Sequence, residues 1–194
     1  MSPVTHYLLG WLVANADGFN RRERAAITLA SVAPDFDGLG AIPELLTRHS
    51  AHPLNWFSEY HHLLGHNLAF GLAVTGASLL LAAKKLKTAA FVLLSFHLHL
   101  LCDVLGARGP DGEQWPIPYL SPFTKAWQWS WSGQWALNAW PNFVITGFAL
   151  IAAFYLAWRR GYSPLEMFSQ KADRMFIEAL WRRFSRTKRM SAGA

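Results

Sequence analysis

Cysteine and charged residues are both scarce in this chain of 194 residues. Cys102 is the one cysteine, so the chain can form no internal disulfide and no zinc site built from cysteines. A metal site would therefore have to use histidine and carboxylate ligands. Charged residues make up 15% of the chain, whereas soluble domains average about 25%, and this deficit indicates a membrane protein.

The sequence pattern of a signal peptide and a uniformly apolar character are also missing. No basic region precedes the apolar residues 7–16 and no cleavage pattern follows them, so we expect no removed signal peptide. The mean hydropathy of +0.13 is low for a chain that lies wholly within a bilayer, so some segments should meet water or the membrane surface. The 10 Trp and 13 Phe agree with this, because aromatic rings favour the headgroup region.

Five apolar segments determine the predicted fold. The segment 139–158 is about long enough to cross a bilayer as a helix, and the segments 68–83 and 88–105 are slightly short. The segments 4–16 and 25–33 are too short to cross and should form short buried helices. The sequence therefore predicts an all-α fold, a small helical membrane bundle with about three near-spanning helices.

Residues 164–189 are expected to form a C-terminal amphipathic helix. Apolar residues recur there at spacings of three and four, and basic residues occupy much of the rest. Such a helix lies on an anionic membrane surface rather than crossing the bilayer; the alternative is that it packs against the core of the protein. We therefore expect two units, a helical membrane domain at 1–160 that carries the functional site and a basic helix and tail at 161–194.

The basic residues border the apolar segments, which is how membrane topology is encoded. The net charge is +6, but the cations form short clusters and not a groove-lining stripe, so no nucleic-acid partner is expected. Placing the clusters on the cytoplasmic side gives a multi-pass membrane protein with a cytoplasmic C-terminus and membrane lipids as partners. The clusters are Arg21, Arg22 and Arg24; Lys84, Lys85 and Lys87; Arg159 and Arg160; and the tail 182–189.

This topology places a set of histidine and aspartate side chains at or near the outer ends of their segments. The charge argument does not require such clustering, so it supports a single shared site. Ionisable groups in apolar segments are costly and usually mark function. The set is His6, Asp35, Asp37, His61, His62, His66, His99 and Asp103.

The spacing of these residues favours a metal site. His99 and Asp103 are four residues apart and share one face of a helix, and His62 and His66 have the same spacing, whereas His61 would point away from His66. Imidazoles with carboxylates suit zinc, or a harder divalent metal where carboxylates dominate.

A metal with an open coordination position predicts a hydrolase, because such a metal lowers the pKa of water. Glu59, Asp37 and Asp111 are the candidate general bases. The alternative is a non-catalytic membrane protein whose metal site is structural or sensory.

The region 106–134 is rich in tryptophan and interrupted by proline and glycine. It is either an aromatic belt that seats the protein in the membrane or a wall that receives a lipid-like substrate. Arg108 in this region could bind a phosphate oxygen or order the turn around it.

Five sequence blocks within residues 1–145 contain most of the candidate residues. They are Thr5-His6, Pro34-Asp35-Phe36-Asp37, His61-His62-Leu63-Leu64-Gly65-His66-Asn67, His97-Leu98-His99 with Asp103, and Gly109-Pro110-Asp111-Gly112 leading to Trp115-Pro116-Ile117-Pro118. In their sequence and order, the blocks together resemble the bacterial inner-membrane metal-dependent hydrolase family, which is distantly similar to zinc-dependent phospholipase C.

The resemblance implies a helical membrane protein with a divalent-metal site. The register of the motif favours His61 as a ligand, while helical spacing favours His62, and both remain candidates. The phospholipase pattern has further His and Glu ligands downstream, but no histidine follows His99 here, so one or two ions are expected rather than three. The matching positions are His6, Asp35, Asp37, His61, His66, His99 and Asp103.

Overall fold

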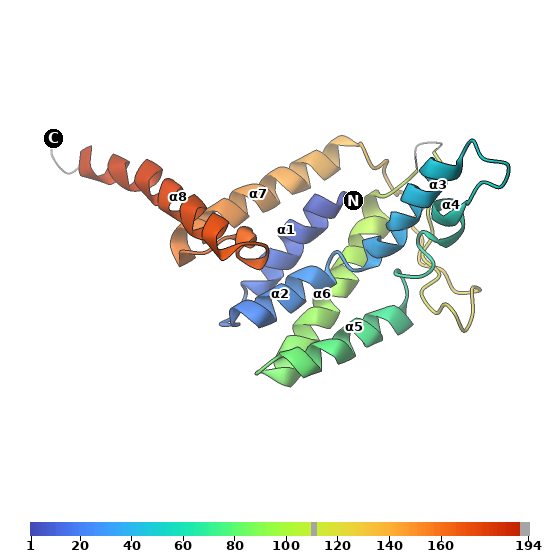
Figure 1. Cartoon of the computed structure of the whole chain (residues 1–194), viewed down its shortest axis with the longest axis horizontal. Helices are drawn as coiled ribbons and strands as arrows, with labels where there is room; N and C mark the ends of the chain where they lie inside the picture. Colours follow the sequence, from blue (N-terminus) through green and yellow to red (C-terminus); the bar gives the residue numbers. More distant parts are fainter. Residues whose placement is uncertain (110–111, 191–194) are drawn as a thin grey trace.

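Helices form nearly all of the regular structure in the described part of the chain (Figure 1). The structure is a computed structural model, and it describes residues 1–109 and 112–190. Within these residues it contains isolated β-bridges but no strand, which confirms the predicted all-α class. The elements are α1 (Pro3–Ala14), α2 (Arg21–Ala30), η1 (Pro34–Gly40), α3 (Ala41–Thr47), α4 (Trp56–Tyr60), α5 (Leu68–Leu81), α6 (Lys85–Gly106), α7 (Trp140–Arg160), η2 (Pro164–Met167) and α8 (Gln170–Met190).

Side-chain caps determine where the early helices begin. The Ser2 hydroxyl accepts a hydrogen bond from the Thr5 amide at the start of α1. At the start of α2, the Asn20 side chain and the Glu23 carboxylate each accept from the other residue's amide, a capping box. This cap starts α2 at Arg21, four residues before the predicted segment, because apolar periodicity does not register a polar first turn.

The structure contains two candidate spans, or three if a bent pair is counted as one span, which agrees with the expected number. Two of them are the predicted segments 88–105 and 139–158, but the third is a different segment. α6 and α7 are long and apolar enough to cross a membrane. The third candidate is a bent pair in which α2 and the segment Pro34–Thr47 meet at 56°. α5 has 14 residues and is apolar but shorter than a span.

The bundle is built around α1, α2 and α6 (Figure 1). α1 packs against α2 and α7, α2 packs against α6, and α6 pairs with α5. Trp11 on α1 and Phe96 on α6 are fully buried in separate apolar clusters. This packing leaves α7 with a large exposed apolar surface, as expected for a helix that faces lipid.

A close approach of α1 and α2 helps to position the site. A Cβ atom on Gly10 would lie 2.0 Å from the Ser31 Oγ, so no side chain fits there. The Ser31 hydroxyl donates to the backbone carbonyl of His6 at 2.7 Å, which ties the end of α2 to the beginning of α1.

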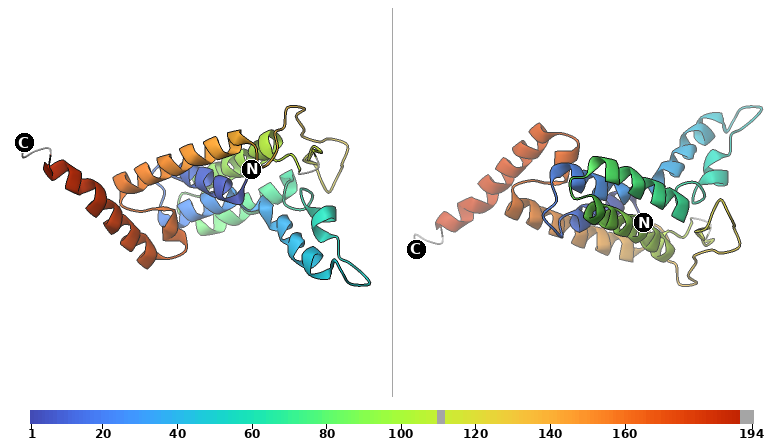
Figure 2. Two further views of the ribbon diagram at one scale, coloured as in Figure 1. Left: turned by 90° about the horizontal axis from the view of Figure 1, so that it is seen from above. Right: turned by 90° about the horizontal axis from the view of Figure 1, so that it is seen from below.

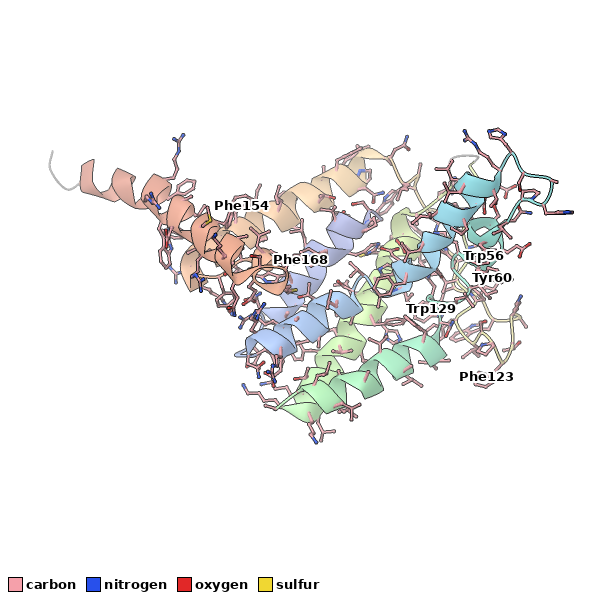
Figure 3. All side chains as sticks on the ribbon, in the orientation of Figure 1. Trp56, Tyr60, Phe123, Trp129, Phe154 and Phe168 are labelled. Atoms are coloured by element: carbon pink, nitrogen blue, oxygen red, sulfur yellow. The ribbon has the colours of Figure 1, made fainter. Side chains whose placement is uncertain are left out.

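The two ends of the bundle carry different structures (Figures 1 and 2). α3, α4 and the long connection between α6 and α7 extend beyond one end, and α8 extends beyond the other. Figure 3 shows Trp56, Tyr60, Phe123 and Trp129 at the first end, and Phe154 and Phe168 toward the second.

The chain turns sharply between α7 and α8. Gly161 ends α7 with a φ of +76°, which a glycine adopts without strain. Arg24 of α2 then holds the turn through two hydrogen bonds to the Glu166 carboxylate, at 2.6 and 2.7 Å. The Asp173 carboxylate accepts from the Ser163 amide and hydroxyl.

The single helix predicted at 164–189 is therefore wrong in its first turn. Residues Pro164–Met167 form a 3-10 helix, and α8 begins at Gln170 because the Ser163–Asp173 contacts close a compact turn before it. Ile177 and Leu180 of α8 pack against Ala157, so the first half of α8 docks on the end of α7. The division into units at 1–160 and 161–194 stays a prediction.

We predict that Glu166→Ala lowers the free energy of unfolding by about 3–5 kcal/mol, because it leaves the Arg24 guanidinium buried without its partner. Thermal unfolding of the purified protein in detergent measures this. Glu178→Ala removes an exposed partner of Arg182 and serves as the matched control, with an expected change of less than about 0.5 kcal/mol. Equal midpoints for the two variants would show that the Arg24–Glu166 pair does not hold the turn.

Candidate metal site

Four separate parts of the chain meet at the end of the bundle where α1 begins. His6 lies in the first turns of α1, and Asp35 and Asp37 follow α2 in η1. His61, His62 and His66 lie in the connection between α4 and α5, outside either helix. His99 and Asp103 lie near the end of α6, one turn apart on the same face.

The first group of converging side chains consists of His6, Asp35, His99 and Asp103. One ligand atom from each lies within 4.8 Å of the others. The Nε2 of His6 is 3.1 Å from one Asp103 oxygen, and the Nε2 of His99 is 3.0 Å from the other. The Nε2 of His99 is also 3.7 Å from an Asp35 oxygen.

The second group consists of His62, His66 and Asp103, again with ligand atoms within 4.8 Å of one another. The Nε2 of His66 is 3.5 Å from an Asp103 oxygen and 3.1 Å from the Nε2 of His99. Asp103 belongs to both groups, and all three side chains of the second group are buried. The groups therefore form one continuous cluster.

A layer of hydrogen bonds fixes the orientation of the rings. The Nδ1 of His99 donates to the Ser31 carbonyl at 2.8 Å. The Asp37 carboxylate bonds to the Nδ1 of His61 at 2.8 Å and to the Nδ1 of His66 at 3.0 Å, and accepts from the Gly65 amide. Such contacts direct the Nε2 atoms inward, as in metal sites whose histidines are held by carboxylates and carbonyls.

The chemistry of these groups fits a divalent cation. Buried polar groups normally have hydrogen-bond partners, yet the Nδ1 atoms of His6 and His62 and the Oδ2 of Asp35 have none. The facing Nε2 atoms of His66 and His99 need a proton or a cation between them, because two nitrogen lone pairs repel. The N-terminal amine of Met1 also contacts Asp103, which shows that this carboxylate attracts positive charge.

Protonation of His66 reflects the same demand for positive charge. Burial disfavours a charged ring, but hydrogen bonds to Asp103 and Asp37 outweigh burial and raise the pKa of His66 to about 9. For His62, burial and the neighbouring rings of His66 and His61 lower the pKa well below its usual value, so its ring is neutral. A neutral imidazole is the form that binds metal, so a cation bound to His66 would have to replace the proton on its Nε2.

His61 and His62 have different neighbours in the structure. Helical spacing was the wrong reason to favour His62, because residues 61–67 form a turn in which His62 has a φ of +66°. The turn nevertheless brings His62 to His66 and Asp103. His61 bonds instead to Asp37 and faces a cavity.

The predicted general bases have different surroundings. The Asp37 carboxylate forms hydrogen bonds with the rings of His61 and His66 and with the Gly65 amide. Glu59 lies on the exposed surface of α4, and Asp111 lies outside the described residues. His49 and His52 are exposed in the connection between α3 and α4.

A cavity of about 670 Å³ adjoins the cluster. His61 and His62 form part of its wall, with Glu44 and Glu113 as its acidic groups. Neither glutamate was predicted, because no spacing or motif relates them to the histidines in the sequence. The lining consists of Glu44, Phe57, Ser58, His61, His62, Gly109, Glu113, Trp115 and Pro116.

The tryptophans in the connection between α6 and α7 differ in their surroundings. Trp115 lines the cavity, whereas Trp127 and Trp131 are exposed. Arg108 donates to the Ser132 carbonyl, which orders the turn around it. His97 points away from the cluster, and its Nε2 accepts from the Tyr119 hydroxyl at 2.8 Å.

Comparison with protein families identifies the chain. The model of the YdjM inner membrane protein family matches residues 1–170, most of the sequence. The chain belongs to this family. No curated protein and no solved structure matches it.

Membership of the YdjM family confirms the predicted inner-membrane protein, in agreement with the apolar helices α6 and α7. The name of the family describes a location and not a reaction. The comparisons give no support for similarity to hydrolases or to phospholipase C, so the chemistry of the cluster must be argued from its geometry.

We predict that His99→Ala and Asp103→Ala each remove divalent metal from the purified protein, because His99 supplies an atom to the first group and Asp103 to both. Metal per chain is measured by plasma mass spectrometry. His49→Ala is the matched control, since it removes an exposed histidine remote from the cluster and should keep the full metal content. Unchanged stoichiometry in the His99 and Asp103 variants would contradict the site.

Proposed function

We propose that this YdjM-family protein is a membrane-embedded, metal-dependent hydrolase that holds one or two divalent ions, with zinc as the best fit to its ligands. The observation that carries the proposal is the convergence of two His/Asp groups on Asp103 beside a cavity. Clusters of histidine and carboxylate in a cleft are typical of metal-assisted catalysis.

The two groups suit different tasks. His6, Asp35, His99 and Asp103 supply four ligands, which is enough to close a tetrahedral site. His62, His66 and Asp103 supply three, and His62 also lines the cavity. Three protein ligands leave a position for water or substrate, as in catalytic zinc sites.

A divalent cation held by the second group would act as a Lewis acid and lower the pKa of a water molecule. His61 is the residue best placed to accept a proton from that water. Its Nδ1 is held by Asp37, which leaves its Nε2 as the free nitrogen, and its ring lies on the cavity wall. Asp37 then acts as a positioning residue for His61 and His66.

The surroundings of the cavity favour a phosphoester or a lipid-like substrate. Phe57 and Trp115 give it an apolar side, and the volume of about 670 Å³ accommodates a small headgroup or ester. The protein belongs to an inner-membrane family, so lipids are the esters present at highest concentration around it.

A non-catalytic metal site is the second candidate, and one observation favours it. The first group offers four ligands, and His6 and His99 are each 1% exposed, which resembles a closed structural site. The catalytic and the non-catalytic site differ in their need for His61, because only the catalytic site requires a proton acceptor.

We predict that the zinc-loaded protein hydrolyses bis(p-nitrophenyl) phosphate or phospholipid in mixed micelles, and that chelation abolishes the reaction. His61→Ala should keep its metal and lose about 10²–10⁴-fold in kcat, because the proton acceptor is removed. Asp37→Asn should alter the pH profile of kcat, since the His61 ring loses its anionic partner.

His49→Ala should retain both metal and activity and serves as the control for the two variants. Full metal content with no hydrolysis of either substrate would favour the non-catalytic site. Equal kcat in wild-type and His61→Ala protein would exclude His61 as the proton acceptor.

We also propose a multi-pass topology in which the basic end of the bundle is cytoplasmic, because basic clusters remain inside. A reporter that is active only in the cytoplasm should be active in cells when it is fused after Ala194. Fusion of a periplasm-dependent phosphatase at the same position should be inactive, and an active phosphatase would reverse the proposed orientation.

A further inference from the structure

α8 presents an apolar face that the protein covers only in part. Phe176, Ile177, Leu180 and Phe184 lie on this face at helical spacing. Ile177 and Leu180 are buried against α7, but Phe184 is 57% exposed, beyond the end of that contact. Trp181, next to this face, is 44% exposed. The outer half of the helix projects past the bundle (Figures 1 and 2).

The opposite side of α8 is cationic. Its exposed basic side chains are accompanied by Glu178, the one exposed acid among residues 159–184, which is paired with Arg182. Glu166 and Asp173 are buried in the turn. The exposed basic residues there, including two at the end of α7, are Arg159, Arg160, Lys171, Arg174, Arg182 and Arg183.

An apolar groove lies beside the start of α8. It has a volume of about 190 Å³ and lies between α1, α7, η2 and α8. Leu150, Phe154 and Leu165 lie along it, and the ring of Phe154 packs against that of Phe176 with centroids 5.5 Å apart. Figure 3 labels Phe154 and Phe168 in this part of the molecule. A groove of this kind suits an acyl chain, because its lining is almost entirely hydrocarbon.

We propose that α8 and this groove form a docking surface for anionic phospholipids of the adjacent leaflet. The acyl chain lies in the groove, Trp181 and Phe184 enter the headgroup boundary, and the basic side chains contact phosphates. An amphipathic helix with basic and aromatic residues binds membranes in this way. This surface lies at the opposite end of the bundle from the metal cluster and does not depend on its chemistry.

Charge selects the lipid leaflet over a second copy of the chain. Two copies that paired through α8 would bring two cationic surfaces together, and like charges in an interface oppose association. An anionic leaflet instead complements the basic residues while its acyl chains cover the exposed aromatic rings.

The test uses the full chain in nanodiscs, which leave both leaflets accessible. A spin label is attached at Phe184→Cys or at Arg182→Cys in a Cys102→Ser background. These two positions lie almost opposite each other on the helix, since two residues correspond to a rotation of about 200°. Accessibility to oxygen and to an aqueous nickel complex reports the depth of each label.

In nanodiscs of phosphatidylcholine with phosphatidylglycerol, we expect the label at 184 to be protected from nickel and the label at 182 to be accessible. In phosphatidylcholine alone, or at high salt, the label at 184 should lose its protection. The double variant Arg182→Glu with Arg183→Glu should lower the ratio of α8 docked on the lipid surface to undocked α8 by at least about 25-fold. Each lost cation lowers this ratio by about fivefold.

Three results would overturn the proposal. The first is a label at 184 that is accessible to nickel in both lipid compositions, and the second is a label at 184 that is equally buried in both. The third is dipolar broadening between labels on two chains. It would overturn the proposal if it persisted when labelled protein is diluted with unlabelled protein before reconstitution at one chain per disc. An unchanged thermal midpoint in the double variant keeps a loss of binding distinct from a loss of folding.

Discussion

The structure depends on partners that balance the charges of several ionisable side chains buried together in an apolar bundle. Asp103 is the centre of this compensation, since it contacts His6, His66, His99 and the Met1 amine. Burial of an uncompensated carboxylate is costly, so α1 and α6 and the turn before α5 must each deliver a nitrogen to it. The contact between α1 and α2 holds His6, and the turn at 61–67 holds His66, in the positions that this compensation uses.

Sequence reasoning succeeded where a residue's position depends on local geometry. His99 and Asp103 share a face because α6 is one uninterrupted helix, so a spacing of four places them together. The positive-inside pattern also predicted the common end at which the histidines and aspartates gather, because charges and apolar lengths determine how the helices alternate. The prediction for His62 and His66 reached the right neighbours by wrong reasoning, since a turn and not a helix joins them.

Sequence reasoning failed where contacts join distant parts of the chain. The Arg24–Glu166 pair spans 142 residues, and nothing in either local sequence predicts it. Glu44 and Glu113 reach the cavity through the fold of α3 and of the loop after α6, whose short elements have weak periodicity. The start of α2 was missed because a polar capping box precedes its apolar residues. Tertiary context decides such positions, and local patterns carry little information about them.

α2 joins the two distinct ends of the molecule. Arg24 in its second turn holds the turn before α8, and the chain leaves its last turn to reach Asp35. A short helix is stiff along its axis, so any shift of α2 would move both of its ends together. It would displace the turn before α8 at one end and change the distance between Asp35 and His99 at the other.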